Sequence, residues 1–599
     1  MIDDPEISSE IVPVEAPPTS EADELLHDLL PKLSEREEEE LASHILSDYD
    51  GALQDRSEWE TRLAEWEDSY HNRLPEKLFP WPGASNFHVP VTMMGIETYK
   101  PRLIEGVLGQ SPPIIVVPSK GADEFRKDTV ELFLNWQIMT EISIEELVAQ
   151  SAHLFLQPGL VVAKTHWKTT RTTRRAIREF PPDTPLASIF DALFGLDLPD
   201  LFQDGELSWS GTVTPSPHGG PALNVSIRMK FLDTMIQVLL EQEELTEVPA
   251  VDLIDPTDLI VPVNGGDNIG QLPWCQLRLW FSEQDLREKV LLGRFDADVV
   301  QTILDQRATP HEDAPATDSH AYREGKANSE GVESHGQSNV RGEQFLVLED
   351  YRRWDINNDG WEEEIIVWVA PELNGRILGW DYLDNVYAHG RRPIRVGRFL
   401  PIPFRFYPIG FAEMIKGIQD EINTIHNQKV DYATLQTLPF YFYRASSSLP
   451  EITQRLRPGV GVPIDNPQQD IQFPKWQGTA GFGAQEEATL YQYLERLSGL
   501  TDLSLGRQPN RVGATRTAKG TQTLLSEAGL RFKFARQAFQ RFWTGIFSDI
   551  LALDQEYLPP NKEFRVTGRR PTAIQLKDRS ELRGRYGLRL ASTADSLNR

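Results

Sequence analysis

The chain has 599 residues, which exceeds what one hydrophobic core usually supports, so two or more domains or one elongated subunit are expected. Its 90 acidic and 60 basic residues give a formal net charge of -30, which excludes a protein that grips polyanionic DNA tightly. The single cysteine, Cys275, excludes an intrachain disulfide and a cysteine-based zinc cluster, and its apolar neighbours predict a core residue.

The N-terminal part, residues 1–75, combines an acidic arm with a helix. Residues 1–60 hold 19 acidic and 3 basic side chains, so more than half of the net charge lies there. A solvated arm is expected, with a docking site for a partner as the alternative. A secretory signal is not expected, because the first residues are acidic and have neither a basic n-region nor an apolar core, and no run of roughly 18 apolar residues predicts a membrane span. Apolar residues at helical spacing predict the helix: Leu41, Ile45, Leu53, Trp59, Leu63 and Trp66.

Residues 76–410 are predicted to form a mixed region, with helices first and strands after them. The segment 123–157 is typical of two helices, and from Gly159 the apolar pattern changes to the period of two that strands have. Ser282 is a predicted helix cap. Residues 308–343 contain almost no large apolar side chains. They are expected to form a mobile surface loop, because ordering them would cost more entropy than their burial returns.

Basic residues gather on the first long predicted strand. Alternate residues of a strand share one face, so this cluster divides between both faces of a sheet. That division favours a ribbon in contact with another subunit, or a solvated hairpin, over a surface that reads phosphates. The cluster comprises Lys168, Arg171, Arg174, Arg175 and Arg178.

The segment that begins at Asp355 has the spacing of a calcium-binding loop. Asp355, Asn357 and Asp359 stand at ligand positions, but Ile366 stands where an EF-hand needs a bidentate glutamate. Asn-Asp-Gly between two strands is also a hairpin signal by itself. We therefore expect a hairpin turn, with calcium held by these three residues and a neighbouring glutamate as the alternative.

No motif in the chain has the pattern of a catalytic site. The nearest, Gly513 to Thr521, resembles a phosphate-binding P-loop. Such a loop needs glycine before its lysine and serine or threonine after it, whereas Ala518 and Gly520 flank Lys519. The chain has no nucleophile elbow, no His-Glu-x-x-His helix and no metal spacing among its histidines. We expect no catalysis and no cofactor.

The most regular stretch runs from Gly410 to Tyr557. It opens with a helix and continues with an insert rich in proline and glycine, a second helix, a polar loop and a long aromatic-rich helix. The apolar stripe of the first helix comprises Phe411, Ile415, Ile418, Ile422 and Ile425. The opposite face, expected to meet water or a partner subunit, carries Glu413, Lys416, Asp420, Glu421 and Asn423.

The order of these features resembles the portal proteins of tailed bacteriophages, from about Trp81 to the C-terminal end. The resemblance implies an α+β fold: an elongated subunit with a mixed wing, a helical stem, a clip insert and a long wing helix, which joins its copies in a ring. The residues that carry it are Trp81-Pro-Gly-Ala-Ser-Asn86, the strand after Gly159, the segment Asp255 to Val263, and Gly410-Phe411 with Ile418-Gln-Asp-Glu-Ile-Asn423 and Asp431.

The resemblance also implies how the chain is divided. The family usually ends in a helical crown, and here the crown is expected to be short or missing. The implied regions are the acidic arm and helix (1–75), the wing (76–410), the first stem helix (411–436), the clip (437–484), the second stem helix (485–502), the tunnel loop (503–518), the long wing helix (519–557) and C-terminal strands (558–599).

Two of these regions are expected to make the functional contacts. Within the tunnel loop, residues 506–517 are rich in basic side chains, have no acid and are short of bulky apolar groups, which suits transient contact with sliding DNA. The alternative pairs these bases with carboxylates of a neighbouring subunit. The DNA-facing residues are expected to be Arg507, Arg511, Arg516 and Lys519. The partner-contacting clip residues are expected to be Pro458, Gly459, Pro463, Pro467 and Trp476.

The implied function is a ring, commonly of twelve copies, at the capsid vertex through which double-stranded DNA is packaged and ejected. The implied partners are the terminase large subunit, the major capsid and scaffolding proteins and the tail adaptor proteins, with no membrane. The chain would act in the virion after assembly in the host cytoplasm. Another structural head or tail protein is an alternative, as is a packaging ATPase, which the broken P-loop opposes.

Overall fold

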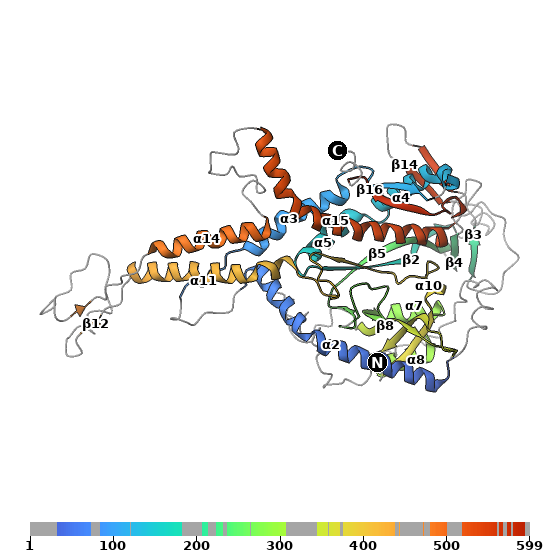
Figure 1. The fold of residues 1–599 in the computed structure, drawn as a ribbon. Helices are drawn as coiled ribbons and strands as arrows, with labels where there is room; N and C mark the ends of the chain where they lie inside the picture. Colours follow the sequence, from blue (N-terminus) through green and yellow to red (C-terminus); the bar gives the residue numbers. More distant parts are fainter. Residues whose placement is uncertain are drawn as a thin grey trace.

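The protein has a body of helices and sheets from which two paired helices protrude (Figure 1). None of the described helices is long and apolar enough to cross a bilayer. The computed structural model describes residues 33–73, 84–119, 121–181, 207–213, 223–231, 236–263, 265–306, 344–357, 359–371, 375–437, 442–443, 471–472, 480–499, 518–559, 562–566, 572–576 and 579–592.

Long helices form the protruding pair and one layer of the body. The longer ones are α2 (Glu35–His71), α3 (Val91–Leu108), α4 (Lys127–Thr140), α5 (Ile144–Leu156), α11 (Phe411–Thr437), α14 (Ala480–Ser498) and α15 (Ala518–Tyr557). The shorter ones are η1 (Gly121–Arg126), α7 (Glu283–Leu291), α8 (Ala297–Gln306), α10 (Leu383–Val386) and η4 (Arg579–Glu581).

Two antiparallel sheets of five strands form the rest of the body. The first has the order β11 (Ile394–Arg398), β2 (Leu160–Phe180), β5 (Ile236–Ile254), β4 (Leu223–Phe231), β3 (Leu207–Val213). The second has the order β10 (Arg376–Tyr382), β9 (Glu363–Ala370), β8 (Gln344–Trp354), β7 (Trp274–Ser282), β6 (Leu259–Ile260). The two-stranded pairs are β1 (Ile114–Pro118) with β16 (Tyr586–Leu590), β14 (Lys562–Val566) with β15 (Thr572–Leu576), and β12 (Phe442–Tyr443) with β13 (Ile471–Gln472).

The inner part of β2 is buried on both faces, which explains its continuous apolar sequence. Val161 and Ala163 lie in a core shared with the helical layer, where Trp543 of α15 is fully buried. Leu160 and Val162 lie in a second core, which the second sheet and α2 complete. Because successive residues of a strand point to opposite faces, one short segment supplies both cores.

A buried ion pair joins the two sheets. Lys164 of β2 lies 2.5 Å from Glu349 Oε1 of β8, and Trp368 Nε1 donates to Glu349 Oε2 at 3.0 Å. The Tyr351 hydroxyl also donates to this carboxylate. Burial alone raises the pKa of Glu349, but Lys164 and these hydrogen bonds outweigh burial and lower it. Glu349 is therefore an ionised group whose lone pairs are satisfied inside the protein.

Much of the predicted secondary structure is confirmed, including the α+β fold class. The two helices predicted within 123–157 are α4 and α5, and Ser282 caps α7 by accepting from the Asp285 amide at 3.3 Å. Cys275 is fully buried, as expected of a core residue. The mobile loop predicted at 308–343 and most of the acidic arm lie outside the described residues.

One predicted boundary is wrong. The second protruding helix, α14, begins at Ala480 rather than residue 485 and ends at Ser498 rather than residue 502. Gly483 in the first turn of this helix permits close packing: a Cβ there would lie 3.0 Å from Lys429 Cγ of α11. Gly483 has a low intrinsic helix propensity, but the close approach of α11 favours a residue without a side chain at this position.

Candidate functional site at the stem helices

The protruding pair, here called the stem, consists of α11 and α14 and carries the short β12–β13 pair beyond its tip (Figure 1). Glu487 of α14 joins the two helices, since it contacts both Lys429 and, at 3.3 Å, His426 Nδ1 of α11. Burial by itself raises the pKa of Glu487, but hydrogen bonds from Lys429 and His426 lower it overall. Glu487 thus links α14 to two side chains of α11.

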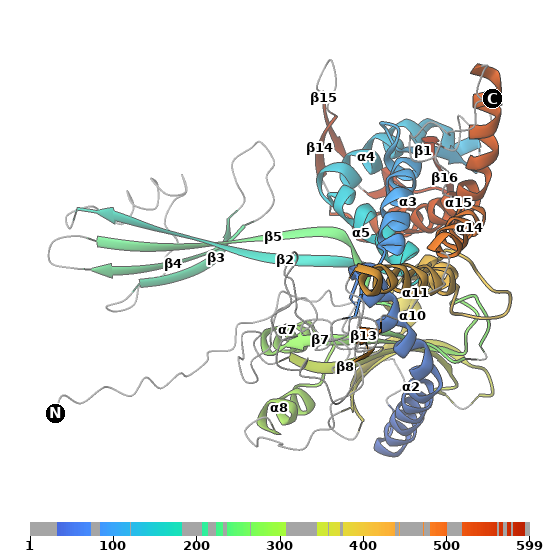
Figure 2. The ribbon, with the colours of Figure 1, turned by 90° about the vertical axis from the view of Figure 1, so that its left-hand side faces the viewer.

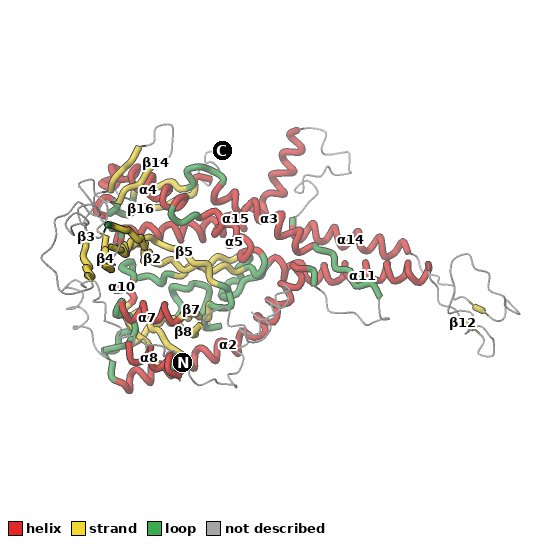
Figure 3. Tube along the Cα trace, turned by 180° about the vertical axis from the view of Figure 1, so that it is seen from behind, coloured by secondary structure: helices red, strands yellow, loops and turns green. Residues whose placement is uncertain are grey.

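An extended segment, residues 84–90, lies along α11 (Figure 3). Its backbone amides donate to side chains of the helix: Ser85 N–H to Asp431 Oδ1 at 2.6 Å, Phe87 N–H to Asn427 Oδ1 at 2.7 Å and Val89 N–H to Asn423 Oδ1 at 2.9 Å. The Asn427 amide donates in return to the Phe87 carbonyl at 2.9 Å. We call this set of contacts the stem ladder.

The spacing of the stem ladder follows from two regular geometries. Its acceptors recur every four residues on α11, and its donors recur every two residues on the extended segment. Four residues of an α-helix rise about 6.0 Å and two residues of extended chain about 6.6 Å, so the two repeats nearly match. The segment can therefore satisfy alternate backbone amides without belonging to a sheet.

The ladder ends at a buried polar cluster around Gln419. The Gln419 amide donates to the Val89 carbonyl at 3.2 Å and contacts His88 Nε2, while Thr92 Oγ1 donates to Gln419 Oε1. Burial lowers the pKa of His88 despite the nearby Asp420 carboxylate. A neutral imidazole can accept from an amide, so this cluster is held by polar groups without net charge.

The sequence analysis assigned Asn423 to a face of α11 that meets water or a partner subunit, and this is wrong. Asn423 is buried under the 84–90 segment. A signal for this contact was present, because polar residues at steps of four run beside the apolar stripe of the helix: Gln419, Asn423, Asn427 and Asp431. The ladder also brings together two of the motifs that carried the resemblance, the one ending at Asn86 and the one containing Asn423.

Helix α2 connects the stem to the second sheet. At its C-terminal half, Arg62 pairs with Glu413 at 3.1 Å and Glu65 pairs with Lys416, both on α11. These pairs are partly exposed, so each contributes little to stability.

Arg56 of α2 is almost fully buried and forms a stronger connection to the body. It donates to the Leu259 carbonyl at 2.8 Å and to the Thr257 carbonyl at 2.5 Å, and it pairs with Glu60 at 2.6 Å.

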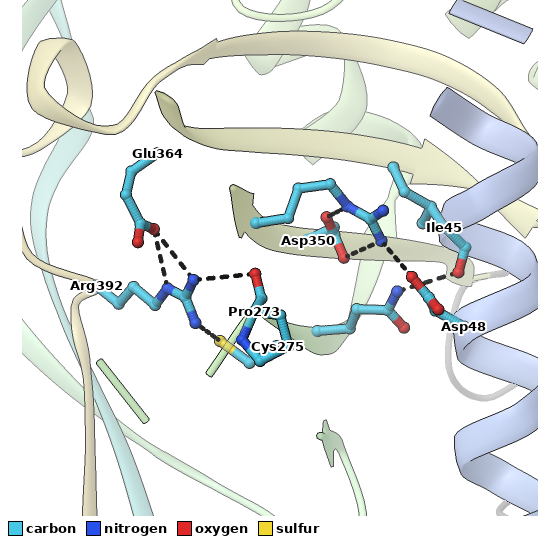
Figure 4. A network of polar contacts seen from close by, with 9 residues as sticks. Ile45, Asp48, Pro273, Cys275, Asp350, Glu364 and Arg392 are labelled. Atoms are coloured by element: carbon cyan, nitrogen blue, oxygen red, sulfur yellow. Dashed lines mark hydrogen bonds and ion pairs between the residues drawn. The ribbon is translucent and has the colours of Figure 1, made fainter. Parts of the chain in front are cut away.

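Figure 4 shows two buried arginines on opposite sides of the second sheet. Arg352 of β8 pairs with Asp350 at 2.5 Å and with Asp48 of α2 at 3.1 Å. On the other side of the sheet, Arg392 pairs with Glu364 at 3.1 Å and contacts Cys275 Sγ at 3.8 Å. Burial raises the pKa of the Cys275 thiol to about 12, so this cysteine is unreactive at neutral pH.

Two polar contacts fix the long helix α15 to the body; one is an ion pair and the other is a hydrogen bond from a neutral amide. Arg395 of β11 holds Asp549 with two hydrogen bonds, of 2.5 and 2.6 Å. Asp554 is buried without a cation: Gln137 Nε2 donates to its Oδ1 at 2.9 Å, and burial raises its pKa to about 8. Asp554 is therefore protonated at neutral pH. Asp554 Oδ2 and Gln137 Oε1 have no hydrogen-bond partner among the described residues.

The residues predicted to contact DNA and partner proteins lie outside the described part of the chain. This holds for Arg507, Arg511 and Arg516 and for the clip residues Pro458, Gly459, Pro463, Pro467 and Trp476. Lys519 lies in the first turn of α15, and its side chain is not described. These assignments therefore stay predictions.

The possible calcium loop is a turn between β8 and β9. The Asp355 carboxylate accepts from the Asp359 and Gly360 amides at 3.1 and 2.8 Å, and Asp359 Oδ1 accepts from the Trp361 amide at 2.8 Å. These oxygens are used by the backbone of the turn, which is the arrangement expected of the hairpin reading. Among the described residues, no group of three acidic, histidine or cysteine side chains is placed to hold a metal.

The protein has an elongated body, a protruding stem of two helices with a strand pair beyond its tip, and a long helix buried in the body. This is the architecture of a phage portal subunit. A family model described as Phage SU10 portal protein matches residues 41–590. The chain therefore belongs to the SU10 portal protein family and has that family's role in DNA packaging. No curated protein matches it significantly. The family implies an oligomeric ring at the capsid vertex, with capsid and terminase partners.

Proposed function

We propose that the chain forms a ring of twelve identical subunits whose stems surround the path of the DNA. The observation that carries this proposal is the stem itself: α11 leaves the body, the short β12–β13 pair lies beyond its far end, and α14 runs back along α11 to the body (Figure 1). A chain that leaves and re-enters the body in this way can offer one end to partners and one side to a central channel.

The tunnel loop is proposed to contact DNA through Arg507, Arg511, Arg516 and Lys519. Support comes from its position in the sequence between α14 and α15, and from its basic composition in a chain of net charge -30. A few basic side chains in an acidic protein suit weak contacts that let DNA slide, because tight binding requires contacts with many phosphates.

The clip is proposed to bind the terminase large subunit during packaging and tail adaptor proteins afterwards. Support comes from the β12–β13 pair, a described part of this insert, which lies beyond the end of the stem (Figure 1). The body is proposed to meet the major capsid and scaffolding proteins. The portal would assemble in the host cytoplasm and act in the virion without catalysis of its own; the family is a structural one.

Electron microscopy of the purified full-length chain tests the ring. Rings with a central channel are expected, and class averages give the number of subunits. Monomers or closed shells would contradict the ring and favour another structural protein of the head or tail.

An in vitro packaging assay tests the tunnel loop. Replacing Arg507, Arg511 and Arg516 with alanine should lower the amount of nuclease-protected DNA several-fold, while rings stay intact. The matched control replaces the same residues with lysine, which keeps the charge and should package close to normally. If the alanine variant packages normally, the loop is not in the DNA path. If its rings fall apart, the arginines serve the subunit interface.

A further inference from the structure

A two-stranded ribbon, β1 with β16, lies on the surface of the body beside the long helix α15 (Figure 1, Figure 2). Its inner face packs on the core shared with the helical layer, where Val116 and Leu590 are buried. Successive residues of a strand point to opposite faces, so the residues between these form an outer face. The outer face carries the exposed Gly587 and Arg589 on β16, and on β1 it carries Val117, which lies opposite Gly587.

The turn between η4 and β16 is held by hydrogen bonds from distant parts of the chain. Gln555 Nε2 of α15 donates to the Leu582 carbonyl at 2.8 Å and to the Gly584 carbonyl at 3.2 Å. The Arg126 guanidinium donates to the Arg583 carbonyl at 3.1 Å. These bonds satisfy successive carbonyls of the turn and hold its backbone in one path, so its side chains project from a fixed support.

Arginines dominate the exposed side chains of this turn and of the ribbon that follows. Residues 579–592 contain four arginines and a single acid, Glu581, in a chain of net charge -30. Arg583, Arg585 and Arg589 are exposed. Arg583 and Arg589 form no ion pair with any residue that the structure describes. We call the surface formed by these three exposed side chains the arginine ribbon.

The surroundings of the arginine ribbon favour nucleic acid over a protein as its ligand. The adjoining residues 120–128 hold three bases and three acids, so the local excess of positive charge remains. Large apolar side chains at this surface are few; among the described residues they are Val117 and Phe125. The core of a protein interface is depleted of charged residues, whereas interfaces with nucleic acid are strongly basic.

We propose that the arginine ribbon binds the phosphate backbone of double-stranded DNA, as a contact separate from the tunnel loop. Arginine suits this ligand, because its planar guanidinium stays charged at neutral pH and can hold a phosphate by two hydrogen bonds. DNA is the polyanion that the family's role in packaging brings to this protein. Three arginines per chain form a weak contact, since tight binding requires contacts with many phosphates.

The position of the arginine ribbon agrees with a DNA ligand. The ribbon lies on the side of α15 toward which the start of this helix projects (Figure 1, Figure 2). The proposed tunnel loop directly precedes that start in the sequence. A DNA path on this side of the subunit would pass both. The inference rests on the packaging role and not on the number of subunits, so a chain that binds DNA here without forming rings would contradict only the proposed ring.

Binding of a short fluorescent DNA duplex to the full-length chain, followed by anisotropy, tests this contact. The variant Arg583→Gln with Arg589→Gln removes two charges from the ribbon. The control, Arg287→Gln with Arg376→Gln, removes two exposed arginines from α7 and β10 and gives the same net charge. At about 50 mM salt the ribbon variant should bind at least about five-fold more weakly than wild type, with a flatter salt dependence, and the control should bind close to normally.

Two results of this measurement would overturn the contact. Equal affinity of wild type and the ribbon variant is one, and equal losses in the ribbon variant and the control are the other, because net charge alone would then explain them. The variant Arg583→Lys with Arg589→Lys keeps the charge and should bind close to wild type. If it binds as weakly as the glutamine variant, the loss reflects damage to the turn, and the proposal is wrong.

Photocrosslinking during in vitro packaging identifies the ligand directly. A photoreactive phenylalanine analogue at position 117 should become attached to DNA. The same analogue at position 291, an exposed site on α7, should not. Attachment of position 117 to a protein would make an acidic protein surface the ligand and overturn the proposal. Packaging without any DNA adduct at position 117 would overturn it as well.

Discussion

The stem ladder and the contact between the two sheets both bury polar groups, but with opposite chemistry. In the ladder, amide and carboxylate oxygens of α11 accept backbone amides of residues 84–90, and the buried cluster at its end has no net charge. Between the sheets, Lys164 and Glu349 are both charged and both buried. The stem ladder is stabilised by several hydrogen bonds of similar strength. The contact between the sheets depends on one ion pair, in which each buried charge needs the opposite charge beside it.

The largest effect is expected at the inter-sheet pair. Glu349→Ala leaves the Lys164 ammonium buried without a partner, which should destabilise the wing by about 3–5 kcal/mol. Urea unfolding followed by tryptophan fluorescence measures this loss. The double variant Lys164→Met with Glu349→Leu removes both charges and should be more stable than the single variant. A loss below about 1 kcal/mol for Glu349→Ala would show that water reaches the pair.

A pH-dependent effect is expected at Asp554, a buried carboxyl with no cation. Its pKa is raised from 3.8 to about 8, so the folded protein binds a proton that the unfolded chain has lost. The stability that this group contributes is present below about pH 4 and is lost as pH rises toward 8, by at most about 4 kcal/mol between pH 5 and pH 8. Asp554→Asn cannot ionise and should remove that decline. Melting curves from pH 5 to pH 8 would reveal it, and parallel curves for both proteins would contradict a raised pKa.

A smaller effect is expected in the ladder. Asn427→Ala removes the acceptor for the Phe87 amide and the donor to its carbonyl, at a cost of about 1–3 kcal/mol. Hydrogen exchange should show faster exchange of the amides of residues 85–89, with the two five-stranded sheets unaffected. The exposed neighbour Gln428→Ala is the control. Because neutral groups are involved, the effect should be the same at low and high salt, and a strong salt dependence would contradict the neutral description.

The helices and strands that were predicted well from the sequence are those whose pattern of apolar residues is compatible with one kind of secondary structure. Phe411, Ile415 and Ile422 repeat at helical spacing, and all three are buried in α11. The pattern of β2 likewise predicted a strand. Such patterns depend on local geometry, which the sequence states directly.

The parts that were missed depend on distant segments. Asn423 was placed on a face that meets water or a partner subunit, because the row of polar residues to which it belongs does not indicate that residues 84–90 will cover it. The start of α14 was placed too late for the same reason, since Gly483 disfavours a helix until Lys429 packs against it. The predicted DNA-contacting arginines cannot be compared in this way, since they lie outside the described residues.

The stem ladder pairs two repeats of slightly different length, that of the extended chain and that of the helix. Each rung adds a mismatch of about 0.6 Å between extended chain and helix, so four rungs accumulate roughly 2 Å, more than the range of hydrogen-bond lengths allows. The amide pairing spans Ser85 to Val89, and α3 begins two residues later, at Val91. A pairing of this kind is self-limiting in length, and it fixes where along the stem helix the chain must turn away.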